Sequence, residues 1–415
     1  MTKKSDAPAI RFKGFSDAWE QRKLGDMMNV TSVKRIHQSD WTDSGVRFLR
    51  ARDIVAAAKN EEPDDYLYIS KEKYEEYSAL SGKVGVSDLL VTGVGTIGVP
   101  YLVRNLEPLY FKDGNIIWFQ NSDKIDGKFL FYSFSAEQIQ GFINESAGIG
   151  TVGTYTIESG KKTPISLPNQ IEQAKVGEFF QQLDNLITLH QRKFEKLTNV
   201  KKSMLEKMFP QNGSSYPEIR FKGFTDPWEQ RKLSEITDKV TEKNAGLQYV
   251  ETFTNSAEFG IISQRDFFDH DIAKLGSLDG YYIVKNEDFV YNPRISTSAP
   301  VGPINRNKLG RTGVMSPLYT VFRPHDIDTT YLEYFFKCGY WHSFMNFNGD
   351  SGARSDRFSI RDNVFFQMPI PIPDIDEQRK IGELLTCLDN LITLHQRELE
   401  KLQNIKKSML EKMFV

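Results

Sequence analysis

The chain has 415 residues with 53 Lys and Arg against 55 Asp and Glu, a formal net charge of −2. This balance excludes indiscriminate charge-driven binding of polyanions by the whole surface, but it leaves room for local basic stripes. The chain has two cysteines and scattered histidines, which predict neither a disulfide framework nor a zinc site. It has no apolar run of roughly 20 residues and no apolar signal-peptide core in MTKKSDAPAI. We therefore expect a soluble, cytoplasmic protein.

A duplicated frame organises the whole chain. Residues 10–24 read IRFKGFSDAWEQRKL and residues 219–233 read IRFKGFTDPWEQRKL, so thirteen of fifteen positions agree. The block 183–209 recurs at 388–414 with twenty-three of twenty-seven positions unchanged. The stretches between the paired blocks share little visible similarity, which indicates one scaffold presenting two different surfaces.

The first insert has the pattern of a mixed domain. Apolar runs predict strands at 46–49, 89–92, 99–103 and 115–119, and a helical pattern follows at 128–144. The segment PISLPNQIEQ, beginning at Pro164, then ends a strand and starts a helix.

That helix carries a coiled-coil seam. Apolar and a few polar residues follow alternating four- and three-residue steps over about four heptads. The seam residues are Val176, Phe180, Leu183, Ile187, His190, Phe194, Leu197, Lys201, Met204 and Met208. At about 1.5 Å per residue, the stretch 180–208 forms a rod of roughly 43 Å. We interpret the seam His and Lys residues as determinants of register and partner choice, because nothing near the histidines forms a catalytic set.

The second half follows the same order. Strands are expected at 260–263, 288–291, 301–305 and 318–323, a helical pattern at 330–347, and PIPIPDIDEQ from Pro369 starts the second rod, whose seam runs from Ile381 to Met413. The sequence predicts an α+β fold in which two similar mixed α/β domains are joined by two long antiparallel coiled-coil helices with approximate two-fold symmetry. We place the domains at 1–169 and 210–374, and the helices at 170–209 and 375–415.

This repeated order resembles the specificity subunit of type I restriction–modification systems. The resemblance covers nearly the whole chain and includes the duplicated regions, the two variable domains, VGTIG at 94–98 and the PxP…EQ segment before each long helix. It implies two target recognition domains that each read one half of a split sequence in double-stranded DNA. It also implies that the helices act as a spacer and dock two methylation subunits, with restriction subunits that translocate DNA joining the larger complex.

The expected dimensions agree with that implication. One turn of B-DNA is about 34 Å, so rods of roughly 43 Å can hold two readers in successive major grooves. Unlike inserts predict an asymmetric, bipartite target. The resemblance assigns no cofactor to this chain and places S-adenosylmethionine, ATP and Mg²⁺ in the partner subunits.

Candidate DNA contacts in the first domain come from an arginine-rich segment and two glycine-rich loops. Arg pairs with guanine, hydroxyl groups donate and accept at base edges, and Gly lets the backbone approach phosphate. The candidates are Arg50, Arg52, Thr92, Gly95, Thr96, Thr151, Thr154 and Tyr155. The alternatives are solvated surface arginines and a tight hairpin that needs Gly for its dihedral angles.

The second domain offers matching loops in YNPRISTSAP and NGDSGARSDRFSI. The candidates are Gln264, Arg265, Asn292, Arg294, Ser296, Thr297, Arg354, Ser355 and Arg357, with the arginines of the later loop the strongest. Asn is suited to adenine, and the alternative is an Asx turn before Pro293.

Two other functional classes remain as alternatives. A methyltransferase would need an Asn/Asp/Ser-Pro-Pro-aromatic loop, and Ser316–Pro317–Leu318–Tyr319 comes close but has Leu at the second Pro. A nuclease would need carboxylates and Lys at close spacing, and no Walker-type loop appears. A coiled-coil adaptor that binds only proteins would explain the rods but not the two diverged inserts. Exposed apolar residues flanking the seam (Leu186, Leu189, Leu391 and Leu394) suggest that the chain needs its partners for solubility.

Overall fold

The chain forms two compact units in the computed structural model, which describes residues 7–147, 153–211, 213–267, 275–350 and 356–415. Unit 1 comprises Met1–Gln191 with Gln396–Val415, and unit 2 comprises Arg192–His395. Each unit therefore contains one mixed domain, the start of one long helix and the end of the other. The predicted α+β class is confirmed, whereas the limits assigned to the recognition domains stay a prediction.

Two sheets form the framework of unit 1. The first is antiparallel, in the order β2-β9-β6-β7, and its strands are β2 (Asn29–Thr31), β6 (Leu89–Thr92), β7 (Pro100–Leu102) and β9 (Ile116–Gln120). The second has the order β3-β5-β4-β8, and its strands are β3 (Trp41–Thr42), β4 (Val46–Leu49), β5 (Leu67–Ile69) and β8 (Leu109–Phe111). All four side chains of β6 are buried, as expected for a central strand between two layers.

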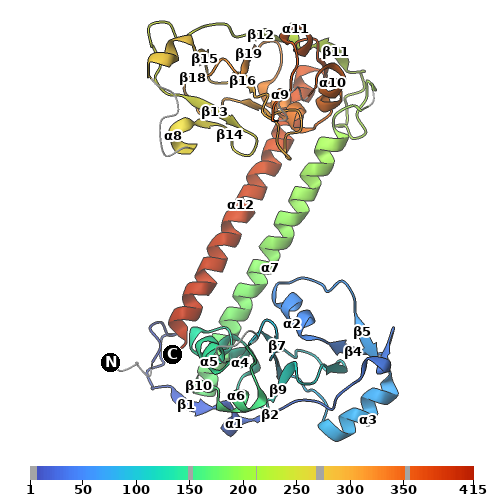
Figure 1. Ribbon diagram of the computed structural model, residues 1–415, viewed down its shortest axis with the longest axis vertical. Helices are drawn as coiled ribbons and strands as arrows, with labels where there is room; N and C mark the ends of the chain where they lie inside the picture. The colour runs from blue at the N-terminus through green and yellow to red at the C-terminus, as the bar shows by residue number, and fades with distance from the viewer. Residues whose placement is uncertain (1–6, 148–152, 212, 268–274, 351–355) are drawn as a thin grey trace. The chain divides into compact units, whose positions relative to one another are not determined.

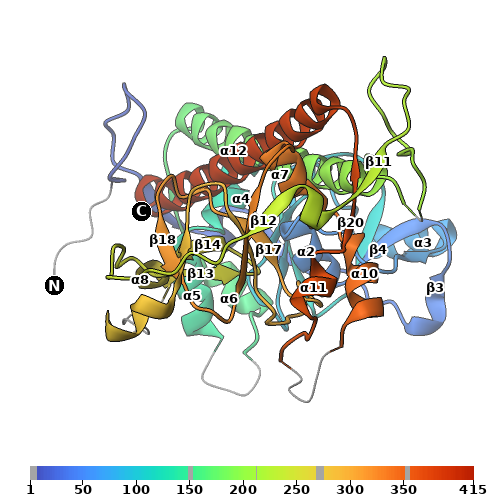
Figure 2. The same ribbon diagram turned by 90° about the horizontal axis from the view of Figure 1, so that it is seen from above.

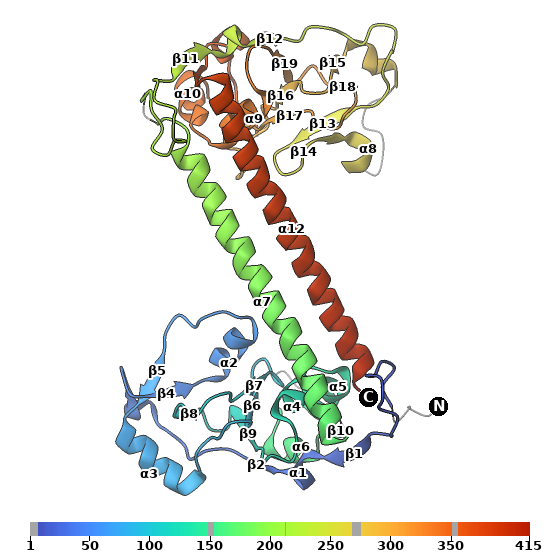
Figure 3. The ribbon, with the colours of Figure 1, turned by 180° about the vertical axis from the view of Figure 1, so that it is seen from behind.

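Helices cover both sheets of unit 1. Those of the first insert are α1 (Leu24–Met27), α2 (Ala51–Ala58), α3 (Lys71–Ser81), α4 (Gly127–Ser133), α5 (Glu137–Ser146) and α6 (Ile157–Lys162), and a 3-10 turn, η1, spans Gln38–Asp40. Figure 3 shows α3 beside β4 and β5, while α4, α5 and α6 lie around the first turns of the long helix α7. The single helical pattern predicted at 128–144 is two helices, because the backbone is extended at Ala136 between them.

Unit 2 repeats the first sheet. Its order β12-β19-β16-β17 uses β12 (Thr237–Lys239), β16 (Phe289–Tyr291), β17 (Ile304–Arg306) and β19 (Thr320–Pro324). Phe289 pairs with Phe322 in unit 2, as Leu89 pairs with Phe119 in unit 1. Two two-stranded antiparallel pairs replace the second sheet. They are β13 (Phe253–Ser256) with β14 (Gly260–Ser263), and β15 (Tyr282–Val284) with β18 (Gly313–Met315). The inserts therefore share a core and differ at its edge.

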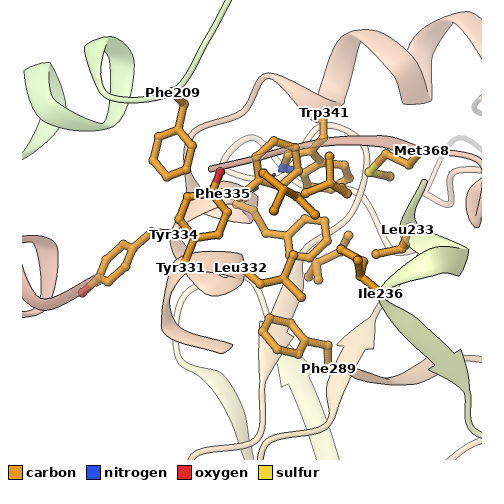
Figure 4. Close-up of a cluster of buried hydrophobic side chains, with 14 of the residues drawn as sticks. Phe209, Leu233, Ile236, Phe289, Tyr331, Leu332, Tyr334, Phe335, Trp341 and Met368 are labelled. Carbon is orange, nitrogen blue, oxygen red and sulfur yellow. Dashed lines mark hydrogen bonds between the residues drawn. The ribbon is translucent and has the colours of Figure 1, made fainter. Parts of the chain in front are cut away.

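The helices of unit 2 follow the same order. They are α8 (Gln264–Phe267), α9 (Thr329–Lys337), α10 (Trp341–Asn348) and α11 (Asp362–Phe365), with 3-10 turns η2 (Leu233–Glu235) and η3 (Leu275–Gly280). The predicted helix 330–347 is interrupted between α9 and α10, where Gly339 has a φ of +77° that other residues adopt only with strain. Figure 4 shows the aromatic core that α9 supplies, with Tyr331 and Phe335 beside Phe209. The rings of Phe209 and Tyr331 lie 5.5 Å apart.

The repeated PxP…EQ segment has a structural explanation in both units. Each begins as a short strand paired with the duplicated frame: β10 (Pro164–Leu167) with β1 (Glu20–Lys23), and β20 (Pro369–Ile372) with β11 (Glu229–Lys232). The Glu of the segment then accepts two hydrogen bonds from an arginine of the duplicated block. Arg11 donates to Glu172 at 2.6 and 2.7 Å, and Arg220 donates to Glu377 with both bonds at 2.8 Å.

The Gln of the same motif fixes the start of each long helix. Gln173 donates to the carbonyl of Pro168 at 2.8 Å and accepts the amide of Asp126 at 3.0 Å. Gln378 makes the equivalent bonds to Pro373 and Asp328 at 2.9 Å each. Both glutamines are buried, so the motif ties a strand end, a helix start and the helix α4 or α9 into one junction.

The two long helices, α7 (Gln170–Lys207) and α12 (Ile375–Met413), are continuous (Figures 1 and 3). Within unit 1, Phe180 of α7 packs on Phe414 beyond α12, and Asp184 pairs with Lys406 at 2.6 Å. Residue numbers rise along α7 as they fall along α12, so the helices run antiparallel there. In unit 2, Lys201 pairs with Asp389 at 2.5 Å. The predicted seam lysines therefore carry a specific function, a cross-helix ion pair in each unit.

The leucines predicted to flank the seam are exposed: Leu186, Leu189, Leu391 and Leu394. Among the described residues, no helix is both long enough and apolar enough to cross a membrane.

Candidate nucleic-acid interface

The two candidate loops of unit 2 meet in space. Arg294 and Arg357 form an isolated antiparallel bridge, although they are far apart in the sequence. The amide of Ile295 donates to the carbonyl of Asp356 at 3.0 Å, and the amide of Phe358 donates to the carbonyl of Pro293 at 2.7 Å. Figure 2 shows α10 and α11 at the two ends of the later loop. These bonds join two loops from separate parts of the second insert into one surface.

This bridge pairs the backbones of two cationic residues, so their side chains leave the bridge on the same side. Arg294 is exposed and Arg357 is partly exposed, and within the described part of the chain neither forms an ion pair with a carboxylate. Two adjacent cations without a carboxylate partner repel each other, so a bound anion stabilises the pair. The neighbouring candidates Arg354 and Ser355 lie outside the described residues.

The remaining candidates of the first loop of unit 2 divide by exposure. Asn292 forms the Asx turn that was the alternative: its Oδ1 accepts the amide of Arg294 at 3.0 Å and its Nδ2 donates to the carbonyl of Asn255 at 2.8 Å. With both ends of its amide bonded internally, the prediction that Asn292 reads adenine is not supported. Ser296 and Thr297 are exposed, and the Ser296 hydroxyl lies 3.2 Å from that of Ser298.

Gln264 and Arg265 lie at the start of α8. Gln264 is buried and its Nε2 donates to the carbonyl of Phe253 at 3.2 Å, so its side chain does not reach DNA in this conformation. Arg265 is exposed and stays a prediction.

Unit 1 brings its two glycine loops together in the same way. The amide of Tyr155 donates to the carbonyl of Gly93 at 2.9 Å, the counterpart of the Phe358–Pro293 bond. A Cβ on Gly93 would lie 2.6 Å from the carbonyl oxygen of Tyr155, so only glycine permits this approach. Gly95, with a φ of +71°, and Thr96 form the exposed tip of the first loop.

Two candidates in these loops are buried instead of exposed. Thr92 accepts the amide of Val99 and donates to the carbonyl of Thr96, which closes the turn. Tyr155 is enclosed, and its hydroxyl is bonded to that of Thr163, while burial raises its pKa well above the usual range. Both side chains therefore have a structural role here, and the DNA contacts predicted at these two positions stay predictions. Thr154 is exposed, and Thr151 lies outside the described residues.

The arginine-rich segment of unit 1 is an ion-pair cluster. Arg50 donates to Asp53 at 2.9 Å and to Asp65 at 3.0 Å, and Arg52 also pairs with Asp65. These carboxylates hold the Arg50 guanidinium at the start of α2 and weaken the prediction that it reads guanine. Arg52 is more exposed than Arg50, so it can exchange Asp65 for phosphate.

A recess that the sequence analysis did not predict adjoins the arginine bridge of unit 2. Its volume is about 490 Å³, and Pro293, Arg357 and Phe358 form one wall. Lys239 and Asp362, which pair with each other, lie at the same recess. The one signal was Ser316–Pro317–Leu318–Tyr319, because three of these residues line it.

No group of three or more His, Cys, Asp and Glu side chains lies close enough together to hold a metal ion within the described ranges. The proposed role of this surface therefore rests on its arginines, hydroxyls and rings.

Comparisons with known proteins agree on one family. The model described as type I restriction modification DNA specificity domain matches residues 16–199 and again 225–404. A type I restriction enzyme specificity subunit of Methanocaldococcus jannaschii is 25% identical over 308 residues, which cover 70% of each chain. A solved structure, the S subunit of a type I restriction-modification system from M. genitalium, covers 99% of each chain with a TM-score of 0.59 and 13% identity, a likeness of fold.

Proposed function

This chain belongs to the family of type I restriction modification DNA specificity domains, and on that premise we propose that it reads a bipartite, asymmetric DNA target with one half-site for each unit. The family match occurs once in each half of the chain, which supports two readers. The units share the central sheet and the helix junction but differ in their edge strands and loops. Because different loops present different donors and acceptors, the two half-sites differ in sequence.

The observation that carries the location of the second reader is the bridge between Arg294 and Arg357. Two loops that are separated in the sequence hold two cations at one surface, and a DNA phosphate or a guanine edge supplies the missing negative potential. In unit 1 the equivalent position is the junction of the glycine loop with Thr154, where exposed Gly95 and Thr96 lie. We propose that these exposed residues, together with Arg52, Arg265, Ser296 and Thr297, supply the remaining DNA contacts.

We propose that the exposed faces of α7 and α12 dock the methylation subunits. Leu186 and Leu189 are exposed on α7, and Leu391 and Leu394 are exposed on α12. Apolar side chains repeated on the surface of one helix mark an interaction face, since each gains free energy when a partner removes it from water. Restriction subunits that translocate DNA join through the methylation subunits.

Catalysis belongs to those partners in this proposal. S-adenosylmethionine, ATP and Mg²⁺ bind there, and this chain supplies target choice in the cytoplasm. The relative from Methanocaldococcus jannaschii is named as a specificity subunit, which supports this division of labour. A purified chain that transfers methyl groups without a second subunit would contradict it.

An exchange of the first insert tests the two-reader proposal. Residues 25–182 are replaced by the equivalent segment of a relative, the chain is expressed with its methylation subunit, and modified bases are mapped. We expect one half of the methylated motif to change and the other half to persist. A change in both halves, or in neither, would contradict one reader per unit.

A further inference from the structure

The recess beside the arginine bridge has the size of a small-molecule site. Its volume is about 490 Å³, within the roughly 300–1,000 Å³ of ligand pockets. Its walls come from the ends of β12, β15, β16 and α11 and from the turn before β19. The lining residues that the argument uses are Lys239, Tyr282, Leu318, Tyr319, Arg357 and Asp362.

The turn before β19 gives this recess an unusual wall. The amide of Tyr319 donates to the carbonyl of Ser316 at 3.1 Å, and the amide of Leu318 lies 3.4 Å from the Ser316 hydroxyl. This tight turn directs Pro317, Leu318 and Tyr319 to the recess. Leu318 is 61% exposed, although it is a large apolar residue.

Aromatic and charged groups complete the lining. Tyr282 carries the Lys243 ammonium 3.4 Å from its ring centroid, which increases the positive potential at this edge. The Tyr319 hydroxyl lies 3.3 Å from that of Thr254, a contact that orients its ring. Lys239 and Asp362 pair with each other at the recess, and both are partly exposed, so a ligand can replace this pair. Asp362 would then accept from an exocyclic amino group, and Lys239 would donate to a ring nitrogen or keto oxygen. Aromatic rings beside one donor and one acceptor suit a nucleobase.

From this geometry we propose that the recess of unit 2 binds a nucleobase that has left the stack of the bound duplex. Base edges inside a groove are read by protein elements that project into it. A concave site beside DNA is filled instead by a group that projects from the duplex, and an extruded base is such a group. Arg357, which lines the recess, and Arg294, its partner in the bridge, bind the phosphates on either side. The base is held there and not altered. This inference rests on the proposed DNA-reading function.

The test uses 2-aminopurine, whose fluorescence rises when it leaves the base stack. The half-site read by unit 2 is first identified by mapping modified bases. Duplexes carrying 2-aminopurine at each position of that half, on either strand, are then titrated with the full chain, alone and in complex with its methylation subunit. We expect one position to brighten several-fold with both forms of the protein.

Variants assign the signal to the recess. Tyr319→Ala is expected to remove most of the brightening and to weaken binding about 10-fold, the loss of one base–aromatic stack. Tyr319→Phe keeps the ring and should keep the signal. Leu318→Ala, at an exposed position that does not endanger folding, should reduce the signal. Tyr216→Ala, at an exposed tyrosine outside the recess, should leave it unchanged.

Two results would overturn the proposal: no position brightens with the chain alone, or the brightening persists in Tyr319→Ala and Leu318→Ala. Failure of the inference and failure of the proposed function are distinguishable. If a bipartite methylated motif is found and no base brightens, the recess alone is misassigned. If no motif is methylated by the complex, the DNA-reading function itself fails.

Discussion

Replacing Arg220 by Met removes one partner of an ion pair whose other partner is almost fully enclosed. Arg220 donates two hydrogen bonds to Glu377, both at 2.8 Å, and the side chains are 14% and 1% exposed. The carboxylate left behind has little access to water. Removing one member of such a buried pair costs about 3–5 kcal/mol, so we expect a loss of that order in the stability of unit 2.

A matched control lies on α12, the helix that carries Glu377. Arg379 pairs with Asp376 at 3.2 Å, but these side chains are 59% and 70% exposed. Because exposed pairs contribute about 0–1 kcal/mol, Arg379→Met should cost little. The double variant Arg220→Met/Glu377→Leu should recover most of the loss, since it leaves no buried charge.

Native-state hydrogen exchange is the suitable assay, because a chain with two units does not unfold in one step. It gives local free energies of opening for the amides of β11, β20 and the first turns of α12. We expect Arg220→Met to lower these values far more than Arg379→Met does. Equal losses in the two variants, or no recovery in the double variant, would refute the view that burial of Glu377 sets the magnitude.

Three further changes test the site and its support. Arg357→Ala should weaken DNA binding about 10-fold and reduce the slope of the logarithm of the binding constant against the logarithm of salt concentration by about one. It should relax sequence specificity only at the second half-site. Titrations at several salt concentrations measure the first two effects. Burial raises the pKa of Glu333, but the neighbouring cations have the larger effect and hold this pKa below the usual value of about 4.3. The ionised Glu333 carboxylate therefore stabilises the fold above that pH, and this stabilisation is lost as the pH falls through the lowered pKa. The difference in local stability between wild type and Glu333→Gln, measured by native-state hydrogen exchange of the α9 amides, should therefore shrink below about pH 4. Gly93→Ala should cost about 1–3 kcal/mol because its Cβ meets the Tyr155 carbonyl, and should impair only the first half-site, whereas Gly141→Ala, with open space around it, should not.

The repeat and the local patterns allowed much of the fold to be predicted. The strands at 89–92 and 260–263 have the predicted bounds, because a short run of apolar residues that is continuous in one and flanked by Gly and Ser in the other favours a strand. The long helices were predictable for the same reason, since their seams repeat over many turns. The break at Gly339 was missed, because one glycine within a strong helical pattern is often tolerated.

The candidate site was harder to predict, because its contacts join distant segments. Thr92 and Tyr155 look like loop residues in the sequence, but hydrogen bonds across the fold bury both. Arg50 looks free until Asp65 is placed beside it. The recess as a whole was not predicted, because Lys239, Tyr319 and their neighbours come together only when distant segments of the chain are folded.

The central claim is that this chain chooses a bipartite DNA target for partner subunits that methylate it. Long-read detection of modified bases in a host without other methylases, expressing this chain with its methylation subunit, tests the claim most directly. The account predicts one split, asymmetric motif with an unread spacer between two different half-sites. A continuous or palindromic motif, or no modification despite a well-formed complex, would contradict it.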